Sequence, residues 1–441
     1  MESDSLVQSA ASVAPIAGDE LKRRRFLQHA GGVLAGAMAS AATGAFAQGE
    51  SASPAAAQAQ AGPEYPPGVP PWSKTPGKPI SKHPYGMPSP FEKDVALDVR
   101  PTDKQYWSSS ARSPLQDLDG IITPNGLFYQ RHHGGVPAID PAQHRLMIHG
   151  KVEKPWLFTM EDLRRFPSVS RIHFLECSGN PGYGVHGKTA AQANGLVSCA
   201  EWTGVPLKTV FEEIGVDTSA KWVVAEGADA AALTRSIPME KCLDDALLVY
   251  SQNGERLRPE QGYPLRLLVP GFEGNMNVKW LRRLHVVDAP AYSREETSKY
   301  TDLQADGKAR QFTFYMEAKS IITSPSGGQK IPKGVCEIRG IAWSGHGKIS
   351  HVDVSVDGGR NWRRAELQLP VLTKALTRFR LLWEWDGKPA VIVSRATDET
   401  GYVQPSLEEL VRLRSLNGTY HNNAMTPWRI AENGELTNAY A

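Results

Sequence analysis

Residues 171–182 have the sequence Arg-Ile-His-Phe-Leu-Glu-Cys-Ser-Gly-Asn-Pro-Gly, and the fold is best approached from this stretch. Its first six residues are typical of a short strand, and the small and turn-forming residues after them predict a tight turn. Cys177 lies at the junction. A cysteine there serves as a nucleophile, one half of a disulfide, a metal ligand or part of the core, and the stretch alone leaves all four open.

Length and composition narrow the class of protein. The chain has 441 residues, too many for one ordinary core, which predicts two folded domains. Hydrophobic residues make up 41% and charged residues 22%, as in a typical globular protein. The net charge of +2 argues against a nucleic-acid-binding protein, which normally carries a basic excess.

The N-terminus has the three parts of an export signal. Lys22–Gln28 is basic, an apolar run of small residues follows it, and Ala45-Phe-Ala47 fits a cleavage site. Arg23 and Arg24, followed by Phe26-Leu27, resemble the twin-arginine type. We therefore predict a twin-arginine signal peptide at residues 1–47, removed on export to the periplasm, with no membrane anchor retained.

Residues 48–305 change character near residue 105. Residues 48–105 are rich in Pro, Ala and Gln, which predicts an extended leader. Residues 106–305 mix short strand-like runs with helical patterns, such as Thr159–Phe166 and Pro206–Gly215. An Asn253-Gly254 turn between apolar runs predicts a hairpin.

Residues 306–441 predict an all-β domain. Their alternating runs, such as 351–359, are separated by turn signals at regular spacing, and we see no helical pattern among them. Several short strands of this kind predict an immunoglobulin-like sandwich. The predicted fold class is therefore α+β, a mixed domain at 106–305 followed by an all-β sandwich at 306–441.

Several motifs in a fixed order carry a resemblance to a known family. The motifs are Tyr129–Pro137 (YQRHHGGVP), Leu175–Asn180 (LECSGN), Gly195–Leu207 (GLVSCAEWTGVPL), Gly262–Gly271 (GYPLRLLVPG), Val278–Val286 (VKWLRRLHV) and Tyr420–Met425 (YHNNAM). Together they resemble the sulfite oxidase family of molybdenum enzymes, and most of all its sulfane dehydrogenase branch with SoxC-type subunits. The resemblance implies a molybdopterin-binding catalytic domain at 106–305 and a dimerisation domain at 306–441.

The resemblance also assigns a role to each residue of the expected active site. Cys177 would ligate molybdenum, for which a soft thiolate is a suitable donor. Arg131 would face both substrate and cofactor, since a guanidinium pairs with two oxygens of a sulfur oxyanion. Tyr300, 21 residues after Lys279, would donate a hydrogen bond and pass a proton. The positions assigned to the cofactor, besides Arg131, are Tyr129, His133, Asp229, Gln261, Arg266, Asn277, Val278 and Lys279. His132 has no assigned counterpart.

Two positions depart from the pattern of sulfite oxidases proper. The family has an arginine shortly after the cysteine, where this chain has Pro181-Gly-Tyr-Gly184. It has another near the C-terminus, where this chain has Asn422 and Asn423. We therefore predict a wider, less basic pocket, which suits a sulfur chain on a carrier protein better than free sulfite.

The resemblance implies an activity and partners. It implies a molybdenum oxidoreductase of sulfur (thiosulfate) oxidation that acts by oxygen transfer at molybdenum. The chain has no C-x-x-C-H haem motif, so its electrons would pass to a separate c-type cytochrome subunit of the SoxD type. The sulfur would be carried by a protein of the SoxYZ type, and the C-terminal domain would form a homodimer.

Four alternatives stay open at this point. A sulfite dehydrogenase with a cytochrome c acceptor and a periplasmic methionine-sulfoxide reductase use the same kind of domain. A non-catalytic exported binding protein with an immunoglobulin-like domain would need no metal. A cysteine hydrolase would need a partner such as His186, to which no pattern ties Cys177. The pairing of Cys199, Cys242 and Cys336 is also open.

Overall fold

The computed structural model describes residues 69–76, 85–100, 107–181, 186–415 and 420–440. The chain divides into two compact units, Met1–Pro84 and Tyr85–Ala441. The described residues of the first unit contain the 3-10 helix η1 (Pro71–Ser73). The predicted signal peptide, residues 1–47, lies outside the described residues. Within the described ranges, no helix is both long and apolar enough to cross a membrane.

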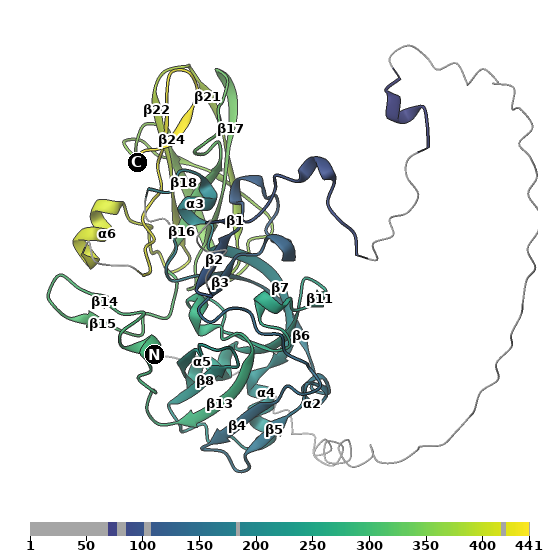
Figure 1. Ribbon diagram of the computed structural model, residues 1–441. Coiled ribbons are helices and arrows are strands. Elements are labelled where there is room, and N and C mark those ends of the chain that lie inside the picture. Colours follow the sequence, from purple (N-terminus) through teal and green to yellow (C-terminus); the bar gives the residue numbers. More distant parts are fainter. Residues whose placement is uncertain (1–68, 77–84, 101–106, 182–185, 416–419, 441) are drawn as a thin grey trace, which may run out of the picture. The chain divides into compact units, whose positions relative to one another are not determined.

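The second unit begins with a small antiparallel sheet (Figure 1). Its strands are β1 (Asp98–Val99), β2 (Ser109–Arg112) and β3 (Gln130–His132). Strand β1 comes from the predicted leader and pairs with β2, with Asp98 opposite Arg112. The leader therefore contributes a strand to the fold. The 3-10 helices around this sheet are η2 (Pro90–Glu92), η4 (Leu115–Asp117) and η5 (Asn125–Leu127).

Two five-stranded sheets follow. One has the order β11-β10-β7-β6, and β12 also pairs with β10. Its strands are β6 (Val169–Glu176), β7 (Val197–Pro206), β10 (Leu247–Gln252), β11 (Glu255–Arg256) and β12 (Arg266–Leu268). The other has the order β5-β4-β13-β8-β9. Its strands are β4 (Leu146–Gly150), β5 (Trp156–Phe158), β8 (Trp222–Gly227), β9 (Thr234–Pro238) and β13 (Leu281–Val287).

Strand β13 runs parallel to β4. Short helices connect the strands of the two sheets. The α-helices are α2 (Met160–Arg164), α3 (Ala190–Asn194), α4 (Leu207–Ile214) and α5 (Met239–Asp244). The 3-10 helices are η7 (Pro259–Gln261), η8 (Gly274–Met276) and η9 (Arg294–Glu296). Apolar residues of α4, β4 and β13 pack in one buried core, in which Ile148, Phe211 and Leu284 are at most 1% exposed. The mixed α+β character of this part was predicted.

Local sequence signals explain where these elements begin and end. Helix α2 starts in a capping box, since Thr159 Oγ1 accepts from Asp162 N–H (3.1 Å) and the Asp162 carboxylate accepts from Thr159 N–H (2.9 Å). Helix α4 ends at Gly215, whose φ of +66° favours glycine. Asn253 and Gly254 also have positive φ, as a two-residue hairpin between β10 and β11 requires. All three elements were predicted.

The C-terminal sandwich consists of the strands β16–β24. One sheet contains β16 (Lys319–Ser324), β17 (Gly334–Trp343), β21 (Thr377–Trp385) and β20 (Glu366–Gln368), in that order. The other contains β19 (Arg363–Arg364), β18 (Ile349–Ser355), β22 (Ala390–Asp398), β23 (Trp428–Ile430) and β24 (Leu436–Asn438). A hairpin of β14 (Asp302–Leu303) and β15 (Ala309–Arg310) precedes it. The all-β class of this part is therefore confirmed.

One helix interrupts the sandwich, which the sequence had not predicted. Helix α6 (Leu407–Arg414) lies between β22 and β23 and begins at Ser406, whose side chain forms a capping box with Glu409. The S-x-x-E signal was present, but eight residues between strands gave little periodicity to support it.

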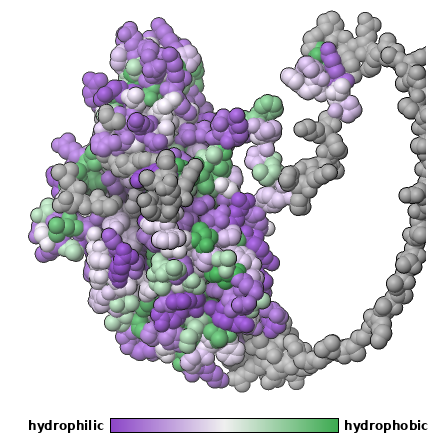
Figure 2. Space-filling view, viewed as in Figure 1, coloured by the Kyte–Doolittle hydropathy of each residue, from purple (hydrophilic) through white to green (hydrophobic). Residues whose placement is uncertain are grey.

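The face in Figure 2 is mostly hydrophilic, with hydrophobic residues in small, separate groups.

The hydrophobic core of the sandwich also includes residues of the sheet that contains β6 and β7. Trp343 and Phe379 from the sandwich belong to the same buried cluster as Phe174 of β6 and Cys199 of β7. The strand that carries Cys177 is therefore packed directly on the C-terminal sandwich.

Candidate functional site

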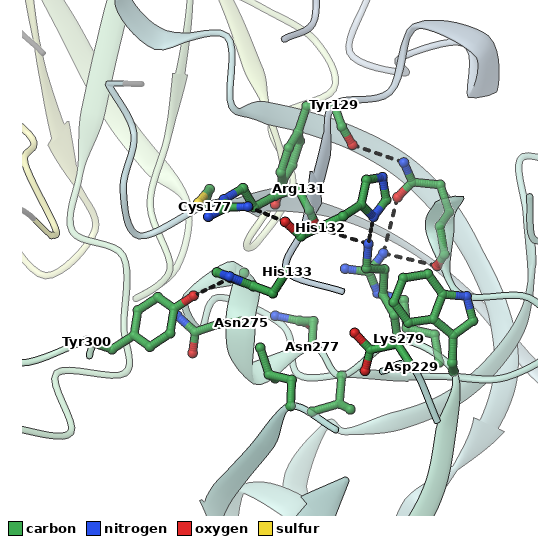
Figure 3. Close-up of a pocket in the computed structure, with 16 residues that line it drawn as sticks. Tyr129, Arg131, His132, His133, Cys177, Asp229, Asn275, Asn277, Lys279 and Tyr300 are labelled. Atoms are coloured by element: carbon green, nitrogen blue, oxygen red, sulfur yellow. Dashed lines mark hydrogen bonds between the residues drawn. The ribbon is translucent and has the colours of Figure 1, made fainter. Parts of the chain in front are cut away.

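A cavity lies at the strand ends of the N-terminal part (Figure 3). The space between its lining side chains is about 660 Å³, which includes space open to solvent. It is lined by Tyr129, Arg131, His132, His133, Cys177, Asp229, Leu233, Gln261, Arg266, Gly274, Asn275, Asn277, Val278, Lys279, Trp280 and Tyr300. All eleven residues that the sequence assigned to the site are among them. The structure thus brings these residues together, while their individual roles stay predictions.

Each residue reaches the cavity from the end of a strand or from a short loop. Arg131 lies in β3, and Cys177 directly follows β6. Asp229 follows β8, and Lys279 lies between η8 and β13. Loops at strand ends can hold side chains toward a ligand while the sheets fix their positions.

Cys177 is a free, partly buried thiol, and the other three cysteines are free as well. Its N–H donates to the carbonyl of Leu196 (3.0 Å), and its carbonyl accepts from Asn180 N–H (2.9 Å), which closes the turn. Burial raises the pKa of the thiol, although Arg131 acts in the opposite direction. A thiol with a raised pKa is a poor nucleophile by itself, which argues against the hydrolase alternative.

His133 and Tyr300 form a hydrogen-bonded pair beside Cys177. The distance from His133 Nε2 to the Tyr300 hydroxyl is 2.8 Å. Burial lowers the pKa of His133 to about 4, and burial together with Cys177 raises the pKa of Tyr300. Both groups are therefore neutral near pH 7 and can exchange a proton. Tyr300 has a φ of +55°, an uncommon conformation for a bulky side chain that is typical of functional sites.

A second cavity adjoins the first, and the space between its lining side chains is about 1110 Å³, which includes space open to solvent. Arg131, His133, Cys177 and Tyr300 line both cavities. The second cavity is also lined by Arg100, Ser108, Ser109, Ser110, Arg112, Gly179, Leu196, Arg294, Glu295, Lys299 and Tyr420. A ligand in the first cavity and a ligand in the second would meet at Cys177.

The lining of the second cavity is basic. Arg100, Arg112, Arg131, Arg294 and Lys299 all line it, and Glu295 is the acidic residue among the described residues that do so. These cations come from segments other than the two family positions at which this chain lacks an arginine. Asn422 and Asn423 line neither cavity, and Asn423 Nδ2 instead donates to the Ala318 carbonyl (3.2 Å). That the pocket is wider and less basic than in sulfite oxidases stays a prediction.

Two family models and several known proteins match this chain. The family model "Oxidoreductase molybdopterin binding domain" matches residues 133–295, and "Mo-co oxidoreductase dimerisation domain" matches residues 310–427. Chicken (Gallus gallus) sulfite oxidase is 31% identical over 70% of this chain and 74% of its own length. Mouse (Mus musculus) mitochondrial sulfite oxidase is 31% identical over 69% of this chain, which spans only 60% of that enzyme.

A solved structure is more similar still. The sulfane dehydrogenase SoxCD from Paracoccus pantotrophus is 47% identical, with a TM-score of 0.82, over 84% of this chain and 97% of that chain. This chain belongs to the sulfite oxidase family. Its fold class and its character as a molybdopterin-dependent oxidoreductase are thereby confirmed. The non-catalytic alternative is set aside.

The first cavity fits a molybdenum cofactor of this family. Asp229 Oδ1 and Arg266 Nε have no hydrogen-bond partner in the described part of the chain, although these residues are only 7% and 4% exposed. Buried polar atoms without a partner cost about 1–3 kcal/mol each, so such atoms indicate a polar ligand. A pterin with its phosphate offers the donors and acceptors that these groups lack.

Two basic side chains, partly buried Lys279 and buried Arg266, face the same cavity. Lys279 Nζ donates to the carbonyls of Arg131 (3.0 Å) and Glu260 (3.1 Å). Burial, together with the Arg266 guanidinium, keeps the pKa of Lys279 well below its ordinary value. Gln261 orients Arg266, whose Nη1 donates to the Gln261 side-chain oxygen (3.2 Å). An anionic phosphate would favour the charged form of Lys279 and gain two strong partners.

The sequence missed five residues that line the first cavity: His132, Leu233, Gly274, Asn275 and Trp280. His132 contacts Lys279, since the two nitrogens lie 2.8 Å apart. At Gly274 a Cβ would stand 2.8 Å from the Glu176 carbonyl and the Tyr129 hydroxyl, so only glycine allows this close approach. The sequence signal for Gly274 was its position between Glu273 and Asn275, and such a signal is weak.

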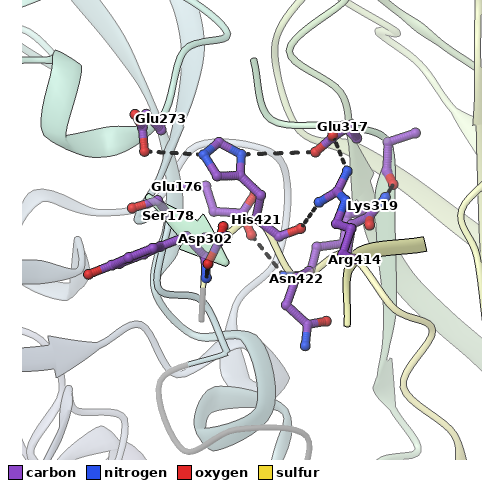
Figure 4. Close-up of polar contacts among 12 residues, drawn as sticks. Glu176, Ser178, Glu273, Asp302, Glu317, Lys319, Arg414, His421 and Asn422 are labelled. Atoms are coloured by element: carbon purple, nitrogen blue, oxygen red, sulfur yellow. Dashed lines mark hydrogen bonds and ion pairs between the residues drawn. The ribbon is translucent and has the colours of Figure 1, made fainter. Parts of the chain in front are cut away.

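A buried network of charged residues lies beside the site, and Figure 4 shows His421 between Glu273 and Glu317 in it. Glu273 pairs with Arg235 (2.9 Å) and contacts His421 Nε2 (3.2 Å). Burial acts to raise the pKa of Glu273, but Arg235 and His421 hold it at about 2. Arg235 also donates to the carbonyl of Glu295 in η9 (2.6 Å), the helix that precedes Tyr300. Since His421 belongs to the C-terminal part, the sandwich and the site share this network.

Proposed function

We propose that this chain is the molybdenum subunit of a sulfane dehydrogenase, which oxidises a sulfur atom carried on another protein. The observation that carries the proposal is the 47% identity to the SoxCD sulfane dehydrogenase over 97% of that chain. The second cavity supports it as well, because the exposed residues Arg294 and Lys299 line it, so that a sulfur chain on another protein can reach Cys177 from the surface.

The bound molybdenum cofactor would supply two-electron oxygen-atom transfer. For a persulfide-type group, each oxygen added to the terminal sulfur comes from water and releases two protons and two electrons: R–S–S⁻ + H₂O → R–S–SO⁻ + 2H⁺ + 2e⁻. Cys177 would hold the metal at the junction of the two cavities, and Arg131 would orient the anionic sulfur terminus. The His133–Tyr300 pair (2.8 Å) lies where a proton must leave.

The electrons need an acceptor that this sequence does not provide. It contains no C-x-x-C-H motif, so the proposal includes a c-type cytochrome subunit, as the two-subunit name SoxCD suggests. A carrier protein of the SoxYZ type would bring the sulfur, and the dimerisation-domain match at 310–427 supports a homodimer. The twin-arginine pattern at Arg23 and Arg24 supports export to the periplasm after cofactor insertion.

A second candidate function is a sulfite dehydrogenase with a cytochrome c acceptor. It is favoured by the basic lining of the second cavity, since five cations suit a small free dianion.

One experiment separates the two candidates. The chain is exported from a host that makes the cofactor, its molybdenum content is measured, and cytochrome c reduction is followed with two substrates. One is free sulfite, and the other is a carrier protein with a cysteine persulfide. The same carrier after treatment with a reductant is the control. We expect kcat/KM at least about 100-fold higher for the carrier. Rapid oxidation of sulfite with a low KM, and none of the carrier, would overturn the proposal in favour of the second candidate.

A further inference from the structure

Glu176, the residue before Cys177, is a fully buried carboxylate with partners on both oxygens. Its Oε1 accepts from Lys319 Nζ (3.0 Å) and Asn180 Nδ2 (2.9 Å). Its Oε2 accepts from Trp343 Nε1 (2.6 Å). A buried carboxylate is tolerated only with such partners, so the end of β6 is fixed by these contacts.

Lys319 uses all three of its N–H donors inside the protein. Besides Glu176, Lys319 Nζ donates to the carbonyls of Asn180 (3.3 Å) and Asn422 (2.8 Å), and the side chain is 2% exposed. One ammonium group thus joins the residue before Cys177, the end of the Cys177–Asn180 turn and the C-terminal segment. Figure 4 shows Lys319 beside Asn422.

Two of the three partners of Glu176, Lys319 and Trp343, come from the C-terminal sandwich. Lys319 is the first residue of β16 and Trp343 is the last residue of β17, and the two lie opposite each other in register. A third contact comes from the segment after α6, where His421 N–H donates to the Ser178 carbonyl (2.8 Å). The turn that presents Cys177 therefore has the sandwich on its buried side and the cavities on its other side.

We propose that Lys319 is a positioning residue, through which the C-terminal sandwich completes the molybdenum site. It holds the Cys177–Asn180 turn in one geometry, and it balances the charge of Glu176 next to the metal ligand. This role concerns the metal site itself and does not depend on which sulfur compound is the substrate.

The main test is Lys319→Met in the exported, cofactor-loaded chain. Loss of the Lys319 cation behind the Cys177 turn leaves Glu176 uncompensated, which would make a metal held by Cys177 harder to reduce. We expect a lower midpoint potential of molybdenum and a changed Mo(V) electron paramagnetic resonance spectrum. Turnover should fall by about 10–100-fold, as is usual when a group behind a metal ligand is removed.

A double variant separates charge from packing. Glu176→Gln with Lys319→Gln keeps polar groups at both positions and removes both charges. We expect it to restore the midpoint potential toward the wild-type value but to keep a changed Mo(V) spectrum, because the turn has lost its ammonium contacts. It therefore serves as the folded variant if Lys319→Met does not fold. The matched control is Lys241→Met. Lys241 is also buried (3% exposed) and paired with Asp245 (2.6 Å), but it makes no contact with the Cys177 turn.

Lys241→Met should lower thermal stability while its spectrum and potential stay those of the wild type. If Lys319→Met and the double variant both keep the wild-type spectrum and potential, Lys319 is only a structural residue and the proposal is wrong. If Lys241→Met shifts the spectrum as much as Lys319→Met, the effect is general destabilisation, which overturns the proposal too.

Discussion

The two cavities that meet at Cys177 differ in how exposed their charged residues are. In the first, Arg266 and Asp229 are buried, and burial lowers the pKa of Arg266 to about 10. In the second, buried Arg112 is joined by Arg294 and Lys299, which are exposed to solvent. The first therefore binds a group that stays in place, and the second attracts an anion that comes and goes.

This difference in burial determines how much free energy each charged side chain contributes to binding and stability. Removing one partner of a buried charged contact typically costs about 3–5 kcal/mol, because the other charge stays buried without compensation. An exposed ion pair is worth about 0–1 kcal/mol and weakens with salt. Substitutions should therefore have large effects around Cys177 and the first cavity, and small ones at the rim of the second.

The largest effect is expected for Cys177→Ser. The hydroxyl is a poor donor for this metal, so we expect at least about a thousandfold loss of turnover, or about 4 kcal/mol. The partly buried side chain is replaced by one of similar size, and circular dichroism should stay unchanged. Cys336→Ser, at a free cysteine in the sandwich, is the control and should keep full activity. Wild-type turnover in Cys177→Ser would exclude a metal-ligand role.

A smaller effect is expected for Tyr300→Phe. It removes the hydroxyl that lies 2.8 Å from His133 Nε2, so turnover should fall by about 100-fold with unchanged molybdenum content. Because the pKa of His133 is held near 4, the neutral ring is available at and above neutral pH and is lost as pH falls through about 4. The acidic limb of the wild-type pH–rate profile should therefore change in the variant. Exposed Tyr292→Phe is the control, and equal losses in both would contradict a proton-transfer role.

The residues of the first cavity were predictable because they lie in short local motifs. Cys177, Arg266 and Lys279 each belong to a stretch whose order along the chain carries the family resemblance. The same is true of the capped helix after Thr159, where two residues three apart determine the helix start.

The residues of the second cavity were not predictable in this way. Arg100 comes from the leader, and Arg294 and Lys299 come from the segment around η9. No local pattern marks them, since only the tertiary fold brings them near Cys177. The Lys319–Glu176 contact was missed for the same reason, because its two residues are 143 positions apart in the chain. The two family positions without an arginine therefore account for only part of the charge around the cavity.

The smallest effect is expected for the double variant Arg294→Gln with Lys299→Gln. Both side chains are exposed, so their charge acts mainly on the encounter with an anionic substrate. We expect KM to rise about threefold to tenfold at low ionic strength with kcat unchanged, and the difference from wild type to shrink as salt is added. Lys308→Gln with Lys388→Gln removes the same charge from side chains that are 83% and 82% exposed and line neither cavity. If this control raises KM equally, net charge alone explains the effect. If the double variant at the rim instead lowers kcat and the molybdenum content, the two cavities are not separate in function, and the exposed cations belong with the cofactor site.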